Sequence, residues 1–275
     1  MARHIWNRLH NDYLRTDRRD DYRALLDLAT GHGYRQMTVG AYAALRRGGV
    51  PAEDERRILI MRHDIDTAPR VARMFAEEEV RVGGRGSYFF RLQTADVRVM
   101  QDLADAGHEV GYHYEELATV AKERGVNGKD RVPEILGEAR ERFLQNLARL
   151  RARTGLPLRI AASHGDFANR ALGVSNTLLL ADRTVRERAG IDLEAYDPEV
   201  EQGLAFRTID MTYPLDWRQG KDPAAAIRAG LGPMLVLTHP RQWGRQWYWN
   251  AREDLKRAAE GVLFSAGLPQ MWRRA

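Results

Sequence analysis

Ile58-Leu59-Ile60-Met61-Arg62-His63-Asp64-Ile65-Asp66 is an apolar run followed by two carboxylates with one residue between them. A run of four large apolar residues predicts a buried strand. Because side chains alternate between the two faces of a strand, Asp64 and Asp66 share one face, and His63 and Ile65 share the other. Neighbouring carboxylates repel each other unless a cation lies between them. The stretch therefore indicates either an Asp-rich turn or a metal site with one Asp free to transfer protons.

Length and composition favour one large α/β domain. The chain has 275 residues, of which 44% are hydrophobic and 29% charged, as in ordinary globular proteins. No run of about 18 apolar residues is present, so the sequence predicts no transmembrane segment. The N-terminus lacks the apolar region of a secretory signal, and we expect a cytoplasmic location. Cysteine is absent, which leaves His, Asp and Glu as candidate metal ligands.

The net charge of +5 comes almost entirely from arginine. A basic protein can bind an anionic partner such as nucleic acid. These arginines, however, are dispersed among Asp and Glu, as in the segment 138–142, and form no basic block interleaved with aromatic residues. We therefore expect no nucleic-acid partner.

Short apolar runs alternate with helical patterns from Ile58 onward, which predicts a parallel sheet with helices outside it. Residues 1–55 predict an α-rich N-terminal extension, 56–245 a barrel core and 246–275 a C-terminal helix, all within a single domain. The predicted strands are 58–62, 87–92, 109–113, 158–163, 206–210 and 234–238, with a weak one at 191–196. The predicted helices are 20–29, 39–47 (capped by Thr38 and ended by Gly48-Gly49), 69–80, 95–106, 132–154 and 223–229.

Polar residues gather at or just beyond the C-terminal ends of the predicted strands. In a (β/α) barrel this edge carries the active site. Three of the eight histidines lie there, which favours an enzyme over a binding module or a purely structural role for each position. One Asp and two His with an open position would hold a catalytic divalent metal. These strand-end residues are Asp64, Asp66, His113, His164, Asp216, Trp217 and His239.

Small and aromatic residues near this edge have two interpretations. Gly111, on the same face as His113, would leave space for a ligand or substrate beside the imidazole. Trp217 offers a flat apolar surface on which a sugar face can stack. The later aromatic residues either contact sugar or pack a C-terminal helix on the barrel; they are Trp243, Trp247, Tyr248 and Trp249.

At these residues the chain resembles the polysaccharide deacetylases of the NodB-homology type (carbohydrate esterase family 4), as a divergent branch. The resemblance covers residues 58–243. The first motif of that family has a catalytic-base Asp followed by a metal-ligand Asp, which assigns these roles to Asp64 and Asp66. The second motif supplies two metal histidines four residues apart; His113 matches the first, and Leu117 stands at the second.

This departure puts the third ligand on another residue. His164 is our candidate for the missing nitrogen ligand, ahead of Glu116. The arginine that braces the catalytic Asp in the family is also absent from its motif, and Arg218 or Arg241 would have to replace it.

The later motifs of the family suggest further roles. Asp216-Trp217 resembles the fourth motif, and we expect both residues, together with Arg241, to bind substrate. The segment 235–239 resembles the fifth, in which Leu237 would line the acyl pocket and His239 would be the general acid.

The resemblance implies an α/β fold, a distorted (β/α) barrel of about seven parallel strands. It also implies a metal-dependent hydrolase that removes an N-acetyl or related acyl group from an amino sugar or glycan precursor. The metal, expected to be zinc with cobalt, nickel or manganese as alternatives, would bind Asp66, His113 and His164. Two other functions stay open: hydrolysis of another non-peptide C–N bond, as in a cyclic imide or ureide, and carbohydrate binding without catalysis, which the missing histidine would explain.

Overall fold

The computed structural model describes residues 6–7, 9–10, 14, 16–49, 55–212 and 216–270. Its strands are β1 (Arg35–Met37), β2 (Ile58–Ile65), β3 (Ser87–Phe90), β4 (Glu109–Tyr114), β5 (Ile160–Ser163), β6 (Leu193–Glu194), β7 (Phe206–Ile209) and β8 (Met234–Thr238). Its α-helices are α2 (Arg19–Gly31), α3 (Val39–Arg47), α5 (Val71–Arg81), α6 (Val97–Asp105), α7 (Glu116–Arg124), α8 (Val132–Thr154), α9 (Phe167–Leu172), α10 (Arg183–Ala189), α11 (Pro198–Glu201), α12 (Pro223–Arg228) and α13 (Trp247–Ser265).

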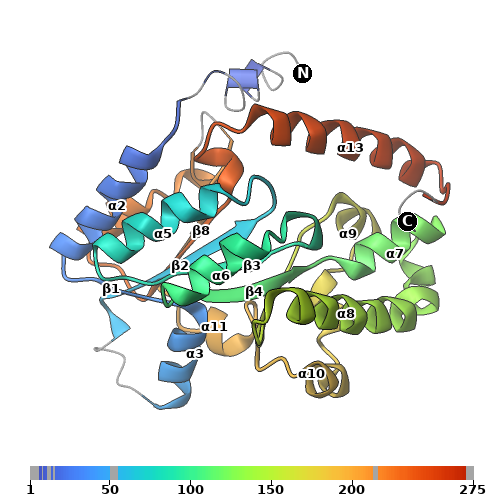
Figure 1. Ribbon diagram of the computed structural model, residues 1–275, viewed down its shortest axis with the longest axis horizontal. Coiled ribbons are helices and arrows are strands. Elements are labelled where there is room, and N and C mark those ends of the chain that lie inside the picture. Colours follow the sequence, from blue (N-terminus) through green and yellow to red (C-terminus); the bar gives the residue numbers. More distant parts are fainter. Residues whose placement is uncertain are drawn as a thin grey trace.

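Seven parallel strands form one curled sheet in the order β6-β5-β4-β3-β2-β8-β7, and β1 pairs in parallel with the first half of β2. Within the described ranges β6 and β7 do not pair, so the sheet is open there; we call this opening the seam. Helices cover the outer face of the sheet, with α5 and α6 in front of it in Figure 1. The fold is the distorted (β/α) barrel that the sequence predicts.

β2 is buried along its whole length and divides its side chains between two apolar cores. Leu59 and Met61 belong to the larger core between the sheet and the helices, whereas Ile58 and Ile60 belong to a smaller core inside the barrel. His63, on the outer face, stacks between Phe75 and Tyr88 with ring centroids 4.5 and 4.4 Å away. Because the strand alternates, Arg62 and Asp64 face the barrel interior.

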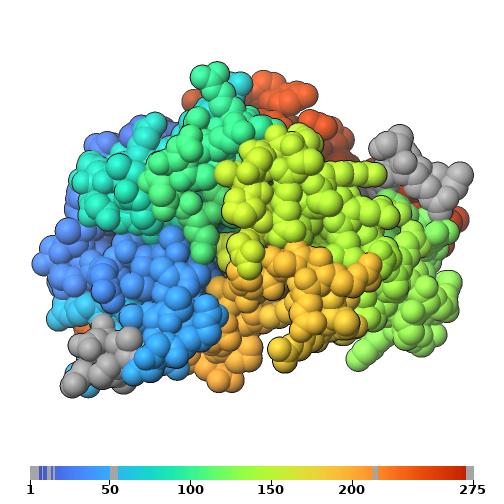
Figure 2. Space-filling view, turned by 60° about the horizontal axis from the view of Figure 1, so that its bottom comes forward, coloured from blue at the N-terminus to red at the C-terminus, as the bar shows by residue number. Residues whose placement is uncertain are grey.

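α3 fills the end of the barrel opposite the strand-end carboxylates. Its backbone N–H groups at Val39 and Gly40 donate to the side chains of Ser87 and Glu109, the first residues of β3 and β4 (2.8 and 3.0 Å). Thr38 caps the helix by accepting the Ala41 N–H (3.1 Å), as the sequence predicts. Figure 2 shows this blue segment lying against the orange segment that contains α11. The polar site is therefore left to the C-terminal ends of the strands.

α13 packs on the barrel through charged side chains. Glu253 and Glu260 are almost fully buried under the helix, and they pair with Arg91 (3.3 Å) and Lys122 (3.0 Å). Figure 1 shows α13 running along one side of the molecule, over the ends of the strands and past α9 and α7. None of the helices within the described ranges is long and apolar enough to cross a bilayer.

The predicted strands and the six predicted helices between residues 20 and 229 match the structure to within a few residues, whereas the C-terminal helix, expected within 246–275, ends at Ser265. The sequence did not predict β1, α7 or the short helices α9, α10 and α11. α7 buries most of its residues, Lys122 and Glu123 included, so its sequence lacks the alternation of an amphipathic helix. β1 is only three residues long and largely polar. It pairs with β2, and Tyr22 of α2 is fully buried and donates to Glu79 (2.9 Å), so the N-terminal segment shares the barrel's core.

Candidate active site

Asp64 lies inside the barrel, held by the residue two positions before it. Nε and Nη2 of Arg62 donate to the two carboxylate oxygens of Asp64 (2.8 and 2.9 Å). Both residues are buried. Burial alone would raise the pKa of Asp64, but the charge of Arg62, followed by that of His113, outweighs it and lowers the pKa below its ordinary value. Asp64 is thus an ionised carboxylate able to accept a proton.

The brace on Asp64 is Arg62 and not Arg218 or Arg241, the two candidates from the sequence. Arg241 forms a bidentate ion pair with Asp254 of α13 (2.9 and 2.7 Å). Arg218 lies on the turn after β7. The signal that would have found Arg62 is the strand periodicity itself, because residues two apart share a face.

Asp66 follows β2 and faces two imidazoles. Its Oδ1 lies 3.4 Å from Nε2 of His113 and 3.4 Å from Nε2 of His164. The ligand atoms of these three residues all lie within 4.8 Å of one another. Oδ1 is buried and accepts no hydrogen bond from the described part of the chain. Burial raises the pKa of Asp66, but His164 and His113 outweigh it and hold the pKa well below its usual range.

Hydrogen bonds orient both imidazoles. Nδ1 of His113 lies 2.9 Å from the carbonyl oxygen of Ala162, which can only accept, so Nδ1 carries a proton and the ring is held with Nε2 toward Asp66. Nδ1 of His164 lies 3.4 Å from a carboxylate oxygen of Glu115, which Arg91 holds in turn (2.7 Å). Metal-binding histidines in proteins are oriented by such partners.

The residues near the expected second histidine do not reach Asp66. Leu117 is fully buried in the outer apolar core. Glu116 accepts hydrogen bonds from Tyr112 and from Asn146 (2.8 Å for Asn146), on the outer side of the sheet. His164, at the end of the neighbouring strand β5, instead places a second imidazole nitrogen 3.4 Å from Asp66.

A second group of possible ligands, Glu115, His164 and Asp166, also lies within 4.8 Å. Cationic side chains already neutralise its carboxylates, since Arg91 binds Glu115 and Lys122 binds Asp166 (2.7 Å each). In the first group a carboxylate oxygen that accepts no hydrogen bond faces two imidazole nitrogens, so its donor set fits a divalent metal ion. Asp66 keeps 18% side-chain exposure, which leaves the site accessible.

His239 forms a dyad with Asp210, which sequence reasoning did not single out. Nδ1 of His239 lies 2.7 Å from Oδ1 of Asp210, and Oδ2 accepts both the backbone N–H of His239 and the indole N–H of Trp243 (2.7 Å each). Burial lowers the pKa of His239, but Asp210, with smaller contributions from Asp66 and Asp64, raises it to about 9. Asp210 lies at the end of a predicted strand, as the other site residues do, and this position could have identified it from the sequence.

Leu237 lies in the inner core, 3% exposed, and pairs in register with Arg62 on one side and Ile209 on the other. The other residues predicted to bind substrate have protein partners. Trp217 packs against Trp243 (5.9 Å between rings) and lines a cavity of about 310 Å³ with α2 and α12. Asp216 lies 3.7 Å from Arg18, and Arg241 is held by Asp254.

The aromatic cluster near the C-terminus divides between packing and exposure. Trp243 is 2% exposed and belongs to the outer core, whereas Trp247 and Tyr248 are each 59% exposed. Trp249 lines a cavity of about 120 Å³ between Asp66, the turn at Gln93 and α13. Of the four aromatic residues, Trp249 alone borders the cavity that includes Asp66.

The absent side chain at Gly111 serves packing, contrary to the expectation of space for a ligand. A Cβ at this position would lie 2.7 Å from the Phe89 ring and 2.8 Å from the Ile160 carbonyl oxygen. The ring of Phe89 therefore occupies the space beside His113.

No known protein family matches the sequence, and no curated protein matches it. Among solved structures the chain is similar to a CE4 family pseudoenzyme from Bacillus anthracis, with a TM-score of 0.39 and 12% identity over 73% of this chain and 60% of that one. It is equally similar to a mutant of that pseudoenzyme with restored enzymatic activity, of which it covers 63%. The chain thus spans less than two thirds of either structure, and a likeness this distant assigns neither a family nor an activity.

Proposed function

We propose that this protein is a metal-dependent hydrolase that removes an N-acetyl or related acyl group from an amino sugar or glycan precursor. The observation that carries the proposal is the buried Oδ1 of Asp66, which accepts no hydrogen bond from the described residues and lies 3.4 Å from the Nε2 atoms of both His113 and His164. Asp64 stands beside this group, with its Oδ2 3.5 Å from Nε2 of His113. A ligand set and a separate braced carboxylate are what hydrolysis by an activated water requires.

Asp66, His113 and His164 would hold the divalent ion, for which we propose zinc, with cobalt, nickel or manganese as substitutes. When bound, such an ion polarises a carbonyl group and lowers the pKa of a coordinated water. The surrounding residues orient the two histidine ligands before the ion binds, since Ala162 fixes His113 and Glu115 faces His164.

Proton transfer would be divided between Asp64 and His239. Asp64 accepts a proton from the attacking water as the new C–O bond forms at the amide carbonyl. His239, which Asp210 keeps protonated, donates its Nε2 proton to the departing amine nitrogen as the C–N bond breaks. The products are a carboxylic acid and a free amine. Leu237 lies beside Arg62 on the neighbouring strand β8, in the inner core, and would contribute apolar surface near the acyl group.

Of the two alternative functions, only sugar binding without catalysis would leave these residues without a role. A sugar-binding module needs neither a braced carboxylate nor an Asp–His dyad, and both are present. Hydrolysis of a cyclic imide or ureide would use the same groups and differ only in the substrate. A panel of N-acetylated sugars, cyclic imides and ureides therefore separates the two hydrolytic functions.

The proposal is tested by metal analysis combined with kinetics. Wild-type protein should bind about one equivalent of zinc, and His164→Ala should lose it, whereas His32→Ala, on the outer surface turn after α2, should retain it. Asp64→Asn should keep the metal and lower turnover on the order of 10²–10⁴-fold. A wild-type protein that binds no divalent metal, or an Asp64→Asn variant within a few-fold of wild-type turnover, would overturn it.

A further inference from the structure

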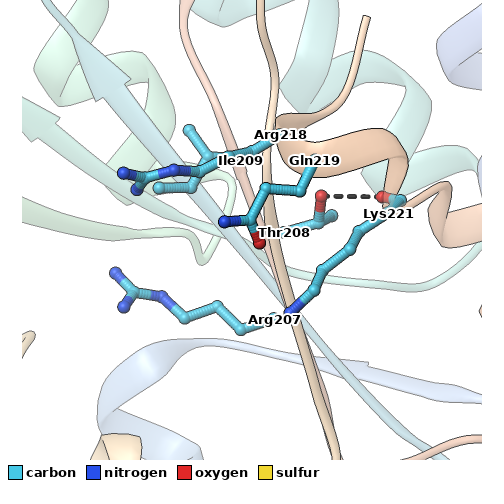
Figure 3. A pocket seen from close by; sticks show the side chains of 6 residues that line it. All are labelled: Arg207, Thr208, Ile209, Arg218, Gln219 and Lys221. Carbon is cyan, nitrogen blue, oxygen red and sulfur yellow. Dashed lines mark hydrogen bonds between the residues drawn. The ribbon is translucent and has the colours of Figure 1, made fainter. Parts of the chain in front are cut away.

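A cationic pocket lies along the seam, apart from the metal-ligand group. It has a volume of about 200 Å³ and is lined by Arg207, Thr208, Ile209, Arg218, Gln219 and Lys221. Figure 3 shows the guanidinium groups of Arg207 and Arg218 extending in the same direction with Gln219 between them. We call this the seam pocket.

The backbone fixes the walls of the seam pocket. β7 pairs with β8 on one edge, and beyond β7 the chain turns back so that Asp210 and Trp217 form an antiparallel bridge. The hydroxyl of Thr208 donates to the carbonyl oxygen of Lys221 (2.8 Å), which ties the returning segment to the strand. The backbone at Trp217 is extended, so the side chains of Trp217 and Arg218 point to opposite sides of that segment. Trp217 points toward α2 and Arg218 toward Arg207.

The charges of the seam pocket are of one sign. Its lining has three cations and no carboxylate. Arg207 forms an ion pair with Glu201 (3.1 Å), which lies outside the lining. The buried Nε of Arg207 donates no hydrogen bond within the described residues. Arg218 and Lys221 are exposed and have no carboxylate within 4 Å among the residues that the structure describes. Paired guanidinium groups next to a lysine suit the oxygens of a phosphate.

The seam pocket is linked to Asp64 by a short chain of contacts. The guanidinium of Arg207 lies 5.4 Å from the Tyr196 ring, and that of Arg62 lies 4.4 Å from the same ring. In the sheet, Ile209 pairs with Leu237, which pairs with Arg62. Ile209 is thus two strand spacings from Arg62, and Asp64 lies two residues further along β2. The distance from the pocket wall to Asp64 is therefore on the order of 12 Å. A phosphorylated monosaccharide can span much of that distance, and the arginine side chains can cover the rest.

We propose that the substrate of the hydrolase is a phosphorylated N-acyl amino sugar whose phosphate binds in the seam pocket, while its acyl group lies at Asp66 and Asp64. This inference rests on the proposed function for the reaction, but the phosphate site itself does not. A sugar monophosphate and a diphosphate-linked sugar both carry such a phosphate, and KM values for substrates of each kind separate the two.

The first test is binding of inorganic phosphate, measured by calorimetry at constant ionic strength. The double variant Arg218→Gln/Lys221→Gln should bind phosphate at least tenfold more weakly than wild type. The matched control Arg98→Gln/Lys129→Gln, which removes two exposed cations far from the seam, should bind like wild type. Because a metal ion could also hold phosphate, the comparison is repeated in an Asp66→Ala background, where the tenfold difference should persist. Equal affinities in the two double variants would overturn the inference.

The second test is the KM for N-acetylglucosamine, its 6-phosphate, its 1-phosphate and its uridine diphosphate conjugate. The seam double variant should raise KM for at least one phosphorylated substrate tenfold and leave KM for the neutral sugar unchanged. An equal effect on all four substrates would overturn the inference while leaving the proposed function in place. If wild type hydrolyses none of them but binds phosphate through Arg218 and Lys221, the proposed function fails and the phosphate site stands.

Discussion

Replacing Arg62 by Met removes one member of a fully buried ion pair and leaves Asp64 without its brace. Breaking a buried pair in this way costs about 3–5 kcal/mol, because the remaining charge stays out of water. His113, 3.5 Å from Asp64, offsets part of this, so we expect the lower half of the range. With an unfolding entropy of about 0.6 kcal/mol/K for a chain of this length, Tm should fall by about 5–7 °C.

The pH dependence of this loss tests its cause. In wild type the pKa of Asp64 is lowered, so Asp64 contributes stability above its ordinary pKa, and this is lost as pH falls through the folded value. Without Arg62, burial dominates and raises the pKa, so folding favours the protonated acid. The stability deficit of Arg62→Met should therefore be largest near pH 8 and shrink toward pH 5.

The assay is thermal unfolding followed by circular dichroism at several pH values from 5 to 8. The matched control is Arg73→Met, which breaks an ion pair with Asp102 (2.7 Å) whose side chains are 37% and 50% exposed. An exposed pair contributes little, so this variant should stay within about 2 °C of wild type at every pH. A deficit for Arg62→Met that equals the control, or that does not change with pH, would refute the reasoning.

Three further variants probe other parts of the site. Asp210→Asn should move the alkaline limb of the kcat/KM profile from about 9 toward the ordinary histidine value near 6.5, because His239 must be protonated to donate; an unmoved limb would contradict its role as the acid. Gly111→Ala should lower the free energy of unfolding in urea by about 1–3 kcal/mol, since its Cβ meets Phe89 at 2.7 Å, and a neutral effect would argue against this packing. Lys122→Met removes the cation that Asp166 and Glu260 share and should loosen α13, seen as faster cleavage at that helix in limited proteolysis; unchanged cleavage would show that the helix does not depend on Lys122.

Local sequence determined the fold class and the strand-end position of the candidate residues. The apolar run at 58–61 is confirmed as the start of a central strand, buried on both faces, and the period of two correctly puts Asp64 and His63 on opposite faces. The alternation of strands and helices is sufficient for these predictions because it depends on neighbours in the chain. Segments without alternation, such as α7, give no such signal.

Only the tertiary structure decided the partners of each side chain. It puts His164 opposite Asp66, gives Asp64 its brace from Arg62, and joins Asp210 to His239 across two neighbouring strands. The distances depend on strand register and on the curl of the sheet. These come from packing between segments far apart in the chain, and no local pattern encodes them.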